Sequence, residues 1–324
     1  MKHSFGVALA AMAALALVAA PSLAQDRIDK PVRIIVGFPP GGTADVMARA
    51  VADKMKDTLG QPVIVENRPG AIGRIAADAV KAAAPDGSTI MVMPIGPMAV
   101  VPHTYKTLSY DPLKDFAPIG MGSTFQFAVA AGPQSGAKTW GEYVVWAKAN
   151  PGKSSYATSG AGSLPHFFGL LVARESGIEL LHVPYKGSAA YMNELLGGNV
   201  PLAVDAIADL TEQHRAGKIR ILASSGAKRS TAVPDVPTFA ELGIKGVEAE
   251  GWFGFFAPAK TPKAIIDQLN RSLNQALTSP EIAQRLAGLG LDPATSTPEE
   301  FARILAADYA KWGPVVKASG FTAE

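Results

Sequence analysis

Three glycine-rich turns contain the residue types most suited to chemistry on a small ligand. They cover residues 39–45, 70–75 and 159–163, and each stands between an apolar segment and the expected beginning of a helix. The first N–H groups of a helix have no acceptor inside the helix, and together with the helix dipole they attract anions. We therefore expect these backbone donors to hold a small anion such as a carboxylate.

The turn at 39–45 gives the clearest of these signals. An apolar run at 34–36 predicts a buried strand, the Pro-Pro-Gly-Gly segment at 39–42 ends it, and a helix begins at Thr43. We expect Asp45, in the first turn of that helix, to cap N–H groups and orient the glycines rather than act as a general base. We also expect a positive φ at Gly42, a conformation that proline would forbid.

Two polar side chains accompany the turn at 159–163. His166 lies at the beginning of the next expected helix, where packing against the preceding loop is the simpler role and lining a ligand crevice is the second. Asp205 ends an apolar strand, so its carboxylate could accept a hydrogen bond from a ligand hydroxyl or amine, or it could cap the following helix. Turns and strand ends of this kind meet at one edge of an open parallel sheet, where ligands bind.

Motifs for catalysis and cofactor binding do not occur in the sequence. It contains no phosphate loop, no dinucleotide fingerprint and no G-x-S-x-G elbow, and its five histidines lack the spacing of a metal site. We therefore expect no cofactor, no metal and no enzymatic activity. One alternative is a secreted hydrolase that uses Ser159 or Ser163 with His166, because a serine nucleophile needs a neighbouring base. A second alternative is a receptor that signals to a membrane kinase.

Strands and helices alternate along the chain and predict an α/β fold of two lobes, each a mostly parallel sheet flanked by helices. We expect crossing strands near 122–126 and 247–251 to join lobe 1, formed by 25–124 plus 250–324, to lobe 2, formed by 125–249. The three C-terminal helices would return to lobe 1. Predicted strands cover 34–36, 62–66, 89–93, 127–131, 155–158, 180–184, 202–205, 219–224 and 250–257. Predicted helices cover 43–59, 75–84, 140–149, 165–175, 262–277, 280–289 and 298–318, with further helices between the strands of lobe 2.

Residues 1–24 have the pattern of an export signal. Lys2 precedes an apolar run, and small residues at 22–24 suit cleavage after Ala24. The apolar run is short for a membrane span, so we expect a soluble mature protein outside the cytoplasm.

Charge and cysteine content narrow the possible partners. The chain has 30 basic and 28 acidic residues and a formal net charge of +2, which argues against binding to nucleic acid. It has no cysteine, so its stability in an oxidising compartment must come from its core. Its 324 residues are enough for two domains, and we expect a monomer.

A series of motifs in a fixed order resembles the Bug family, the periplasmic substrate-binding proteins of tripartite tricarboxylate transporters. The resemblance extends over essentially the whole chain after the export signal. The matching segments are Lys30–Val36, Phe38–Asp45, Glu66–Ala71, Ala84–Gly87, Ser159–Ser163 with Pro165-His166, His182–Ser188, Leu195–Asn199, Ala216–Lys218, Ala227–Ser230, Pro234–Pro237 and Trp252–Gly254 with Ala257-Pro258.

This resemblance implies a fold, a ligand class and partners. The family's fold is a venus-flytrap clamp of the type 2 periplasmic-binding-protein class, and its members bind organic acids, in some cases amino acids or amides. The implied partners are the large and small transmembrane subunits of the transporter. The resemblance implies that ligand carboxylates are held by backbone N–H groups and ordered water. Those donors correspond to Gly42, Thr43, Ala44 and Asp45 in lobe 1 and to Ser159, Gly160 and Ala161 in lobe 2.

Two departures from the family pattern bear on the ligand. The segment Gly70–Gly73 has isoleucine where the family commonly has glycine, and Ile95–Met98, in the third crevice loop, is more apolar than the polar run often found there. Phe38, Gly96 and Pro97 complete our set of candidate ligand-binding residues. The departures favour a carboxylate with an apolar or aromatic body over a highly charged ligand such as citrate.

Overall fold

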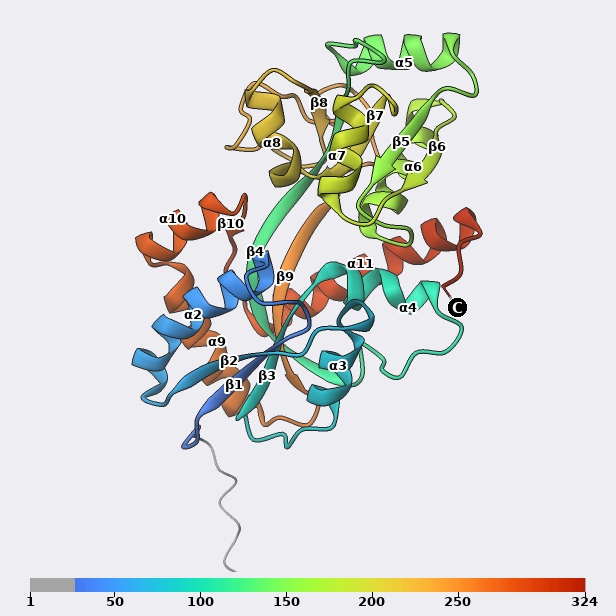
Figure 1. The fold of residues 1–324 in the computed structure, drawn as a ribbon. Coiled ribbons are helices and arrows are strands. Elements are labelled where there is room, and N and C mark those ends of the chain that lie inside the picture. The colour runs from blue at the N-terminus through green and yellow to red at the C-terminus, as the bar shows by residue number, and fades with distance from the viewer. Residues whose placement is uncertain (1–26, 324) are drawn as a thin grey trace, which may run out of the picture.

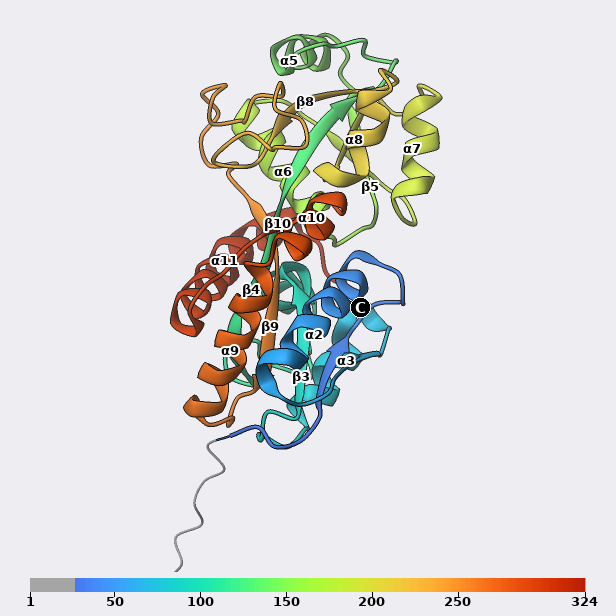
Figure 2. The same cartoon turned by 90° about the vertical axis from the view of Figure 1, so that its left-hand side faces the viewer.

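One long strand belongs to both halves of the molecule. The computed structural model describes residues 27–323, so the expected signal at 1–24 lies outside the described residues. Strand β4 (Phe116–Ala131) pairs antiparallel with β9 (Glu250–Pro258) in one sheet, and its last residues pair with β7 (Leu202–Ala206) in another. Figure 1 shows β4 and β9 rising side by side, and Figure 2 shows β4 continuing from the lower half into the upper one. We call the half that contains β9 the first lobe and the half that contains β7 the second lobe.

The first lobe is a mixed sheet between two layers of helices. Its strand order is β2-β1-β3-β9-β4, with β1, β2 and β3 parallel and β9 antiparallel to both of its neighbours. The further strands are β1 (Val32–Val36), β2 (Val63–Asn67), β3 (Thr89–Pro94) and the short β10 (Asp292–Pro293), which pairs with β4. The helices are α2 (Thr43–Leu59), α3 (Arg74–Lys81), α4 (Val101–Thr104), α9 (Lys263–Leu277), α10 (Pro280–Gly288) and α11 (Pro298–Ser319).

Successive side chains of a strand point to opposite faces of the sheet. The buried side chains of the first lobe therefore form two clusters, one under each layer of helices. Ile34 and Val36 of β1 pack in the cluster that contains α2 and α9, whereas Ile35 packs with the cluster that contains α3 and α11. Because helices cover both faces, the strand is apolar on both sides, and this is why residues 34–36 are a continuous apolar run.

The second lobe repeats this arrangement on the strand order β4-β7-β5-β6, with β8 (Arg220–Ser224) also paired to β4. Here β5 (Ser155–Thr158) and β6 (Leu181–Pro184) are parallel to β7, and β4 is antiparallel to them. The helices are α5 (Trp140–Ala149), α6 (Leu164–Ser176), α7 (Ser188–Leu196) and α8 (Ile207–Arg215). The predicted α/β class is confirmed, and the sheets are mixed: every pairing that involves β4 or β9 is antiparallel, and the other pairings are parallel.

Strand β4 joins the predicted crossing strand near 122–126 to the predicted strand at 127–131, and it begins earlier than both, at Phe116. One proline and two glycines lie at 118–122, a composition unfavourable to a regular strand. The structure accommodates them with register shifts against β9 at Pro118/Gly120 and at Met121/Ser123, which keep the strand continuous.

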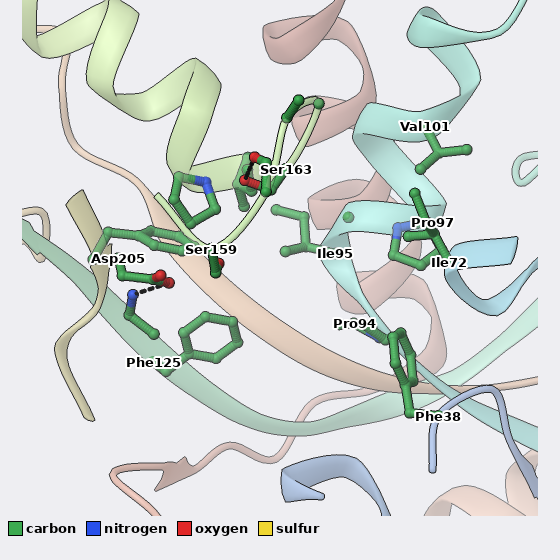
Figure 3. A pocket seen from close by; sticks show the side chains of 18 residues that line it. Phe38, Ile72, Pro94, Ile95, Pro97, Val101, Phe125, Ser159, Ser163 and Asp205 are labelled. Carbon is green, nitrogen blue, oxygen red and sulfur yellow. Dashed lines mark hydrogen bonds between the residues drawn. The ribbon is translucent and has the colours of Figure 1, made fainter. Parts of the chain in front are cut away.

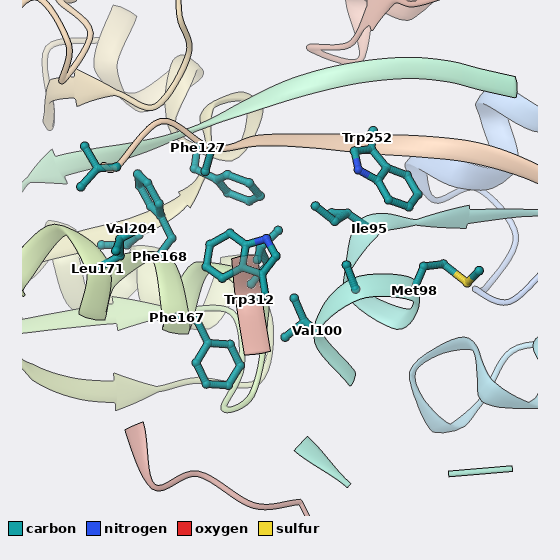
Figure 4. Close-up of a cluster of buried hydrophobic side chains, with 14 of the residues drawn as sticks. Ile95, Met98, Val100, Phe127, Phe167, Phe168, Leu171, Val204, Trp252 and Trp312 are labelled. Carbon is teal, nitrogen blue, oxygen red and sulfur yellow. The ribbon is translucent and has the colours of Figure 1, made fainter. Parts of the chain in front are cut away.

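The last helix and the residues after it contact both lobes. Trp312 of α11 is fully buried, and Figure 4 shows it between Phe127 and Phe168 of the second lobe and Val100 of the first. Beyond the helix, Phe321 packs edge-on against the His166 ring in the second lobe, while the Ala323 N–H donates to the Thr104 carbonyl in the first, at 2.7 Å. The C-terminal helices therefore pack on the first lobe as predicted, and α11 also contacts the second.

Close packing at one helical glycine gives a test of this fold. A Cβ atom at Gly169 in α6 would lie 2.1 Å from the buried Tyr156 ring, whose hydroxyl donates to the His166 carbonyl at 2.8 Å. We expect Gly169→Ala to lower the free energy of unfolding by about 1–3 kcal/mol, measured by urea denaturation. The control is Gly141→Ala in α5, where an added Cβ meets no atom within 4 Å, so no loss is expected. Equal stability of the two variants would contradict this packing.

Candidate functional site

A largely apolar cavity of about 440 Å³ lies between the lobes, and its size is that of a small-molecule site. Figure 3 shows side chains from both lobes pointing into it. The first lobe contributes the loop after β1, the left-handed turn at 71–73 and the segment from the end of β3 into α4. The second lobe contributes β4, the glycine turn before α6 and the end of β7. The lining residues are Phe38, Ile72, Pro94–Pro97, Val101, Phe125, Phe127, Ser159–Pro165, Asp205 and Ala206.

The wall from the second lobe is a glycine turn held in place by its own side chains. Ser163 caps α6 by accepting from the His166 N–H at 3.4 Å, and its hydroxyl donates to the Gly160 carbonyl at 2.7 Å. Gly162 has a φ of +71°, and its N–H donates to His166 Nδ1 at 3.2 Å. Ser159, Gly160 and Ala161 lie on the cavity wall, and the Gly160 N–H donates to the Thr158 hydroxyl at 3.4 Å.

The turn before α2 is organised by Asp45, as predicted. Its buried carboxylate accepts from the Gly41 N–H at 2.9 Å, from Asn67 at 2.8 Å and from the Arg49 guanidinium. Burial raises the pKa of Asp45, but these hydrogen bonds, led by the one from Arg49, outweigh it and bring the pKa to about 2. The expected positive φ at Gly42 is wrong: φ is −74° there and +82° at Gly41. The left-handed residue is the one whose N–H turns back to Asp45.

Seven of our twelve candidate residues line the cavity, and five do not. Those that line it are Phe38, Gly96, Pro97, Ser159, Gly160, Ala161 and Asp205. Gly42, Thr43, Ala44 and Asp45 lie at the N-terminus of α2, outside the cavity lining, and Thr43 borders a separate cleft with Asp209 and Gly290. His166 lies under the glycine turn.

His166 has a structural environment. Its ring stacks on that of His182 with a centroid distance of 3.8 Å, and His182 Nε2 is 2.8 Å from the Thr158 hydroxyl. Burial lowers the pKa of His166 to about 4 and, with the repulsion from His166, lowers that of His182 to about 3. Both rings are therefore neutral at pH 7. The ring nitrogen Nδ1 of His166 is engaged by the Gly162 N–H, the Ser163 hydroxyl donates to the Gly160 carbonyl, and the Ser159 hydroxyl interacts with Asp205. Neither serine of the hydrolase alternative is therefore paired with His166 as a nucleophile with its base.

Several lining residues were not among our candidates. Phe125 and Phe127 gave only the signal of a core strand. Ile72 was marked by its departure from the family pattern; it lines the cavity, is half exposed and has a φ of +56°, which is unusual for a β-branched residue. Such backbone strain tends to cluster at functional sites.

The charges at the cavity wall are few. Asp205 is the one ionisable side chain among its described lining residues, and no lysine, arginine or histidine is among them.

Within residues 27–323 no three acidic, histidine or cysteine side chains are grouped to hold a metal ion. In the same range no helix combines the length and apolarity that a membrane crossing requires.

Comparison with known proteins connects this geometry to a receptor family. Residues 47–321 match the family described as "Tripartite tricarboxylate transporter family receptor". The chain is 36% identical over 308 residues to Protein BugT of Bordetella pertussis, covering 95% of this chain and 94% of that protein.

Solved structures are similar over nearly their whole length. MatC (Rpa3494) from Rhodopseudomonas palustris with bound malate is 31% identical, with a TM-score of 0.74, and the match covers 89% of this chain and 99% of MatC. R. palustris Rpa4515 with adipate is 32% identical, with a TM-score of 0.78, and the match covers 91% and 98% of the two chains.

The environment of Asp45 predicts a specific loss of stability in acid. Its pKa is lower in the folded protein than the ordinary 3.8, so its ionised form stabilises the fold above pH 4, and this stabilisation of about 2 kcal/mol is lost as the pH falls from about 4 to 2. We expect Asp45→Asn to be less stable than wild type at pH 7 and to approach it near pH 2, in urea unfolding at several pH values.

The matched control for this experiment is Asp53→Asn, because Asp53 is an exposed acid on the same helix. It should change stability little at any pH. A constant difference between wild type and Asp45→Asn from pH 7 to 2 would show that the Asp45 charge contributes nothing.

Proposed function

Because this chain belongs to the tripartite tricarboxylate transporter family of receptors, we propose that it captures a small organic acid in the cavity between its lobes. Members of this family are binding proteins and not enzymes. The observation that supports this site is the combination of an apolar cavity with the glycine turn Ser159–Ser163 that leads into the N-terminus of α6. Backbone donors at a helix N-terminus are suited to a carboxylate.

We also propose the route that the ligand takes. The family is one of periplasmic binding proteins, and the pattern at residues 1–24 supports export and cleavage after Ala24. From the family we infer delivery of the acid to the large and small transmembrane subunits of a permease by a monomeric receptor. No nucleic acid or cofactor takes part in this proposal.

Capture is proposed to involve closure of the lobes. We take residues 25–124 plus 250–324 as one lobe and 125–249 as the other, because β4 changes sheets after Gln126 and β9 begins at Glu250. Closure would bring the N–H groups of Gly42, Thr43, Ala44 and Asp45 to the ligand from the first lobe. A ligand drives closure only if it binds the closed state more tightly than the open one.

The lining favours an acid with an apolar or aromatic body. Side chains of Phe38, Ile72, Ile95 and Phe125 cover much of the wall, and burial of apolar ligand surface against them is favourable. Two similar structures contain malate and adipate, which are small carboxylates. These relatives support a small carboxylate as the ligand class. Within that class, the apolar wall of this chain favours an acid with an apolar or aromatic body.

Two glycines on opposite walls offer a direct test of the site. A Cβ added at Gly96 or Gly160 meets no protein atom within 4 Å, and neither residue has a positive φ, so each alanine variant should fold normally. Because the added methyl group would occupy ligand space, we expect each variant to bind its acid at least tenfold more weakly. The measurement is calorimetry with the tightest ligand from a thermal-shift screen of malate, adipate, benzoate and related acids.

The control is Gly141→Ala, which adds the same methyl group to α5, away from the cavity, and should not change affinity. Unchanged affinity in both cavity variants would place the ligand elsewhere.

A proline at Thr43 tests the proposed donors of the first lobe. Thr43 is the first residue of α2, where proline is well accommodated, and Gly42 before it has an extended conformation (φ −74°, ψ 167°) that proline tolerates. Thr43→Pro should therefore remove one N–H without loss of stability, and we expect at least tenfold weaker binding, since a hydrogen bond to a charged group contributes about 1.5–3 kcal/mol.

Thr43→Ala is the matched variant, because it keeps the N–H and changes only the side chain. It should bind like wild type. If both substitutions at Thr43 leave the affinity unchanged, the α2 N-terminus is not part of the site.

A further inference from the structure

The carboxylate of Asp205 is buried at the wall of the cavity, and one of its oxygens lacks a well-formed hydrogen bond. The residue lies at the end of β7 and is only 4% exposed. Its Oδ1 accepts from the Ala206 N–H at 2.8 Å, whereas no donor among the described residues reaches Oδ2 with full hydrogen-bond geometry. The hydroxyls of Ser159 and Tyr191 and the Ser159 N–H interact with the carboxyl group more weakly. Figure 3 shows the carboxylate beside Ser159 and Phe125. Buried polar atoms in folded proteins are nearly always hydrogen-bonded. An exception at the wall of a cavity therefore indicates a ligand that supplies the missing donor.

The groups around Asp205 shift the pKa of its carboxyl group. Burial and, to a smaller extent, repulsion from Asp209 on α8 raise the pKa of Asp205 to about 7, against the opposing hydrogen bonds from the Ala206 N–H and from the Ser159 hydroxyl and N–H. On the remaining side, the hydroxyl of Tyr191 on α7 is buried, and Asp205 raises the pKa of that phenol. Asp209 interacts in turn with Ser188. No cation is among these groups.

This charge distribution determines what can lie beside Oδ2. A second ligand carboxylate would meet the negative charges of Asp205 and Asp209 in a wall without lysine, arginine or histidine. A neutral or positive hydrogen-bond donor would instead satisfy the open acceptor.

We propose that Asp205 is a specificity-determining residue whose Oδ2 accepts a hydrogen bond from the ligand, so that the bound acid carries an N–H or O–H donor besides its carboxylate. The inference rests on the proposed function, since it assumes that the cavity holds an organic acid. A site with a buried acceptor rejects analogues that lack the donor, because their binding leaves the acceptor unpaired in a dry environment. Of the two acids present in similar structures, malate has such a hydroxyl group and meets this requirement, whereas adipate has none and does not.

The experiment compares pairs of acids that differ by one donor. The pairs are succinate with malate, adipate with 2-aminoadipate, and benzoate with 4-hydroxybenzoate, measured by calorimetry at pH 8, where Asp205 is mostly ionised. We expect the wild-type protein to bind the donor-bearing member of at least one pair tenfold or more tightly than its partner.

The Asp205→Asn variant should reverse this preference. Because the side-chain oxygen would remain on the Ala206 N–H, the amide NH2 would take the place of Oδ2 and replace an acceptor with a donor. The acid without the extra donor should then bind at least as tightly as its partner. The control is Asp209→Asn, which removes a neighbouring charge outside the cavity lining and should keep the wild-type order of each pair.

The outcomes separate this inference from the proposed function. If no acid binds to the folded wild-type protein, the proposed function fails, and this inference fails with it. If acids bind but neither the wild type nor Asp205→Asn distinguishes the members of any pair, the inference alone is wrong. Tighter binding of succinate or adipate, with uptake of one proton in buffers of different ionisation enthalpy, would also overturn it, because Asp205 would then be protonated and would act as the donor.

Discussion

The antiparallel ladder between β4 and β9 is the connection on which both lobes depend. β4 leaves this ladder after Gln126 and enters the second sheet at Phe127, so one strand belongs to two hydrogen-bonded sheets. Backbone hydrogen bonds fix the spacing of the strands, while the register shifts near Pro118 and Met121 locally increase their twist. The two walls of the cavity are therefore positioned by main-chain geometry, and the side chains on those walls are free to specify the ligand.

The site combines an apolar enclosure with few polar groups. Hydrogen bonds are stronger in a dry cavity than in water, so a carboxylate can be held by amides without an arginine. The same dryness makes the unpaired Oδ2 of Asp205 costly until a ligand donor meets it. The absence of a cationic side chain from the described lining and the presence of one acid there both disfavour ligands of high negative charge. The charges at the wall and the apolar lining therefore favour the same ligand, an acid with few negative charges and an apolar body.

The C-terminal segment connects the two walls independently of the strands. Phe321 contacts the second-lobe glycine turn beside Gly162, where a Cβ would lie 2.6 Å from its ring, and Ala323 is hydrogen-bonded to Thr104 at the end of α4. α4 begins at Val101, which lines the cavity. Together with Trp312, this segment supports both sides of the ligand space from behind. Its aromatic contacts also explain why His166 is a buried, neutral packing residue.

The sequence alone determined the order and most limits of the helices and strands, because these follow from apolar periodicity, glycine and proline positions and capping residues close in the chain. It also determined the capping role of Asp45, which depends on residues within one turn. The tertiary structure decided that Gly41 and not Gly42 is left-handed, that β4 extends back to Phe116, and that the α2 N-terminus lies outside the cavity. It also brought Ile72, Phe125 and Asp205 to one cavity. These outcomes depend on contacts between segments far apart in the chain, and local patterns carry no information about which distant surfaces meet.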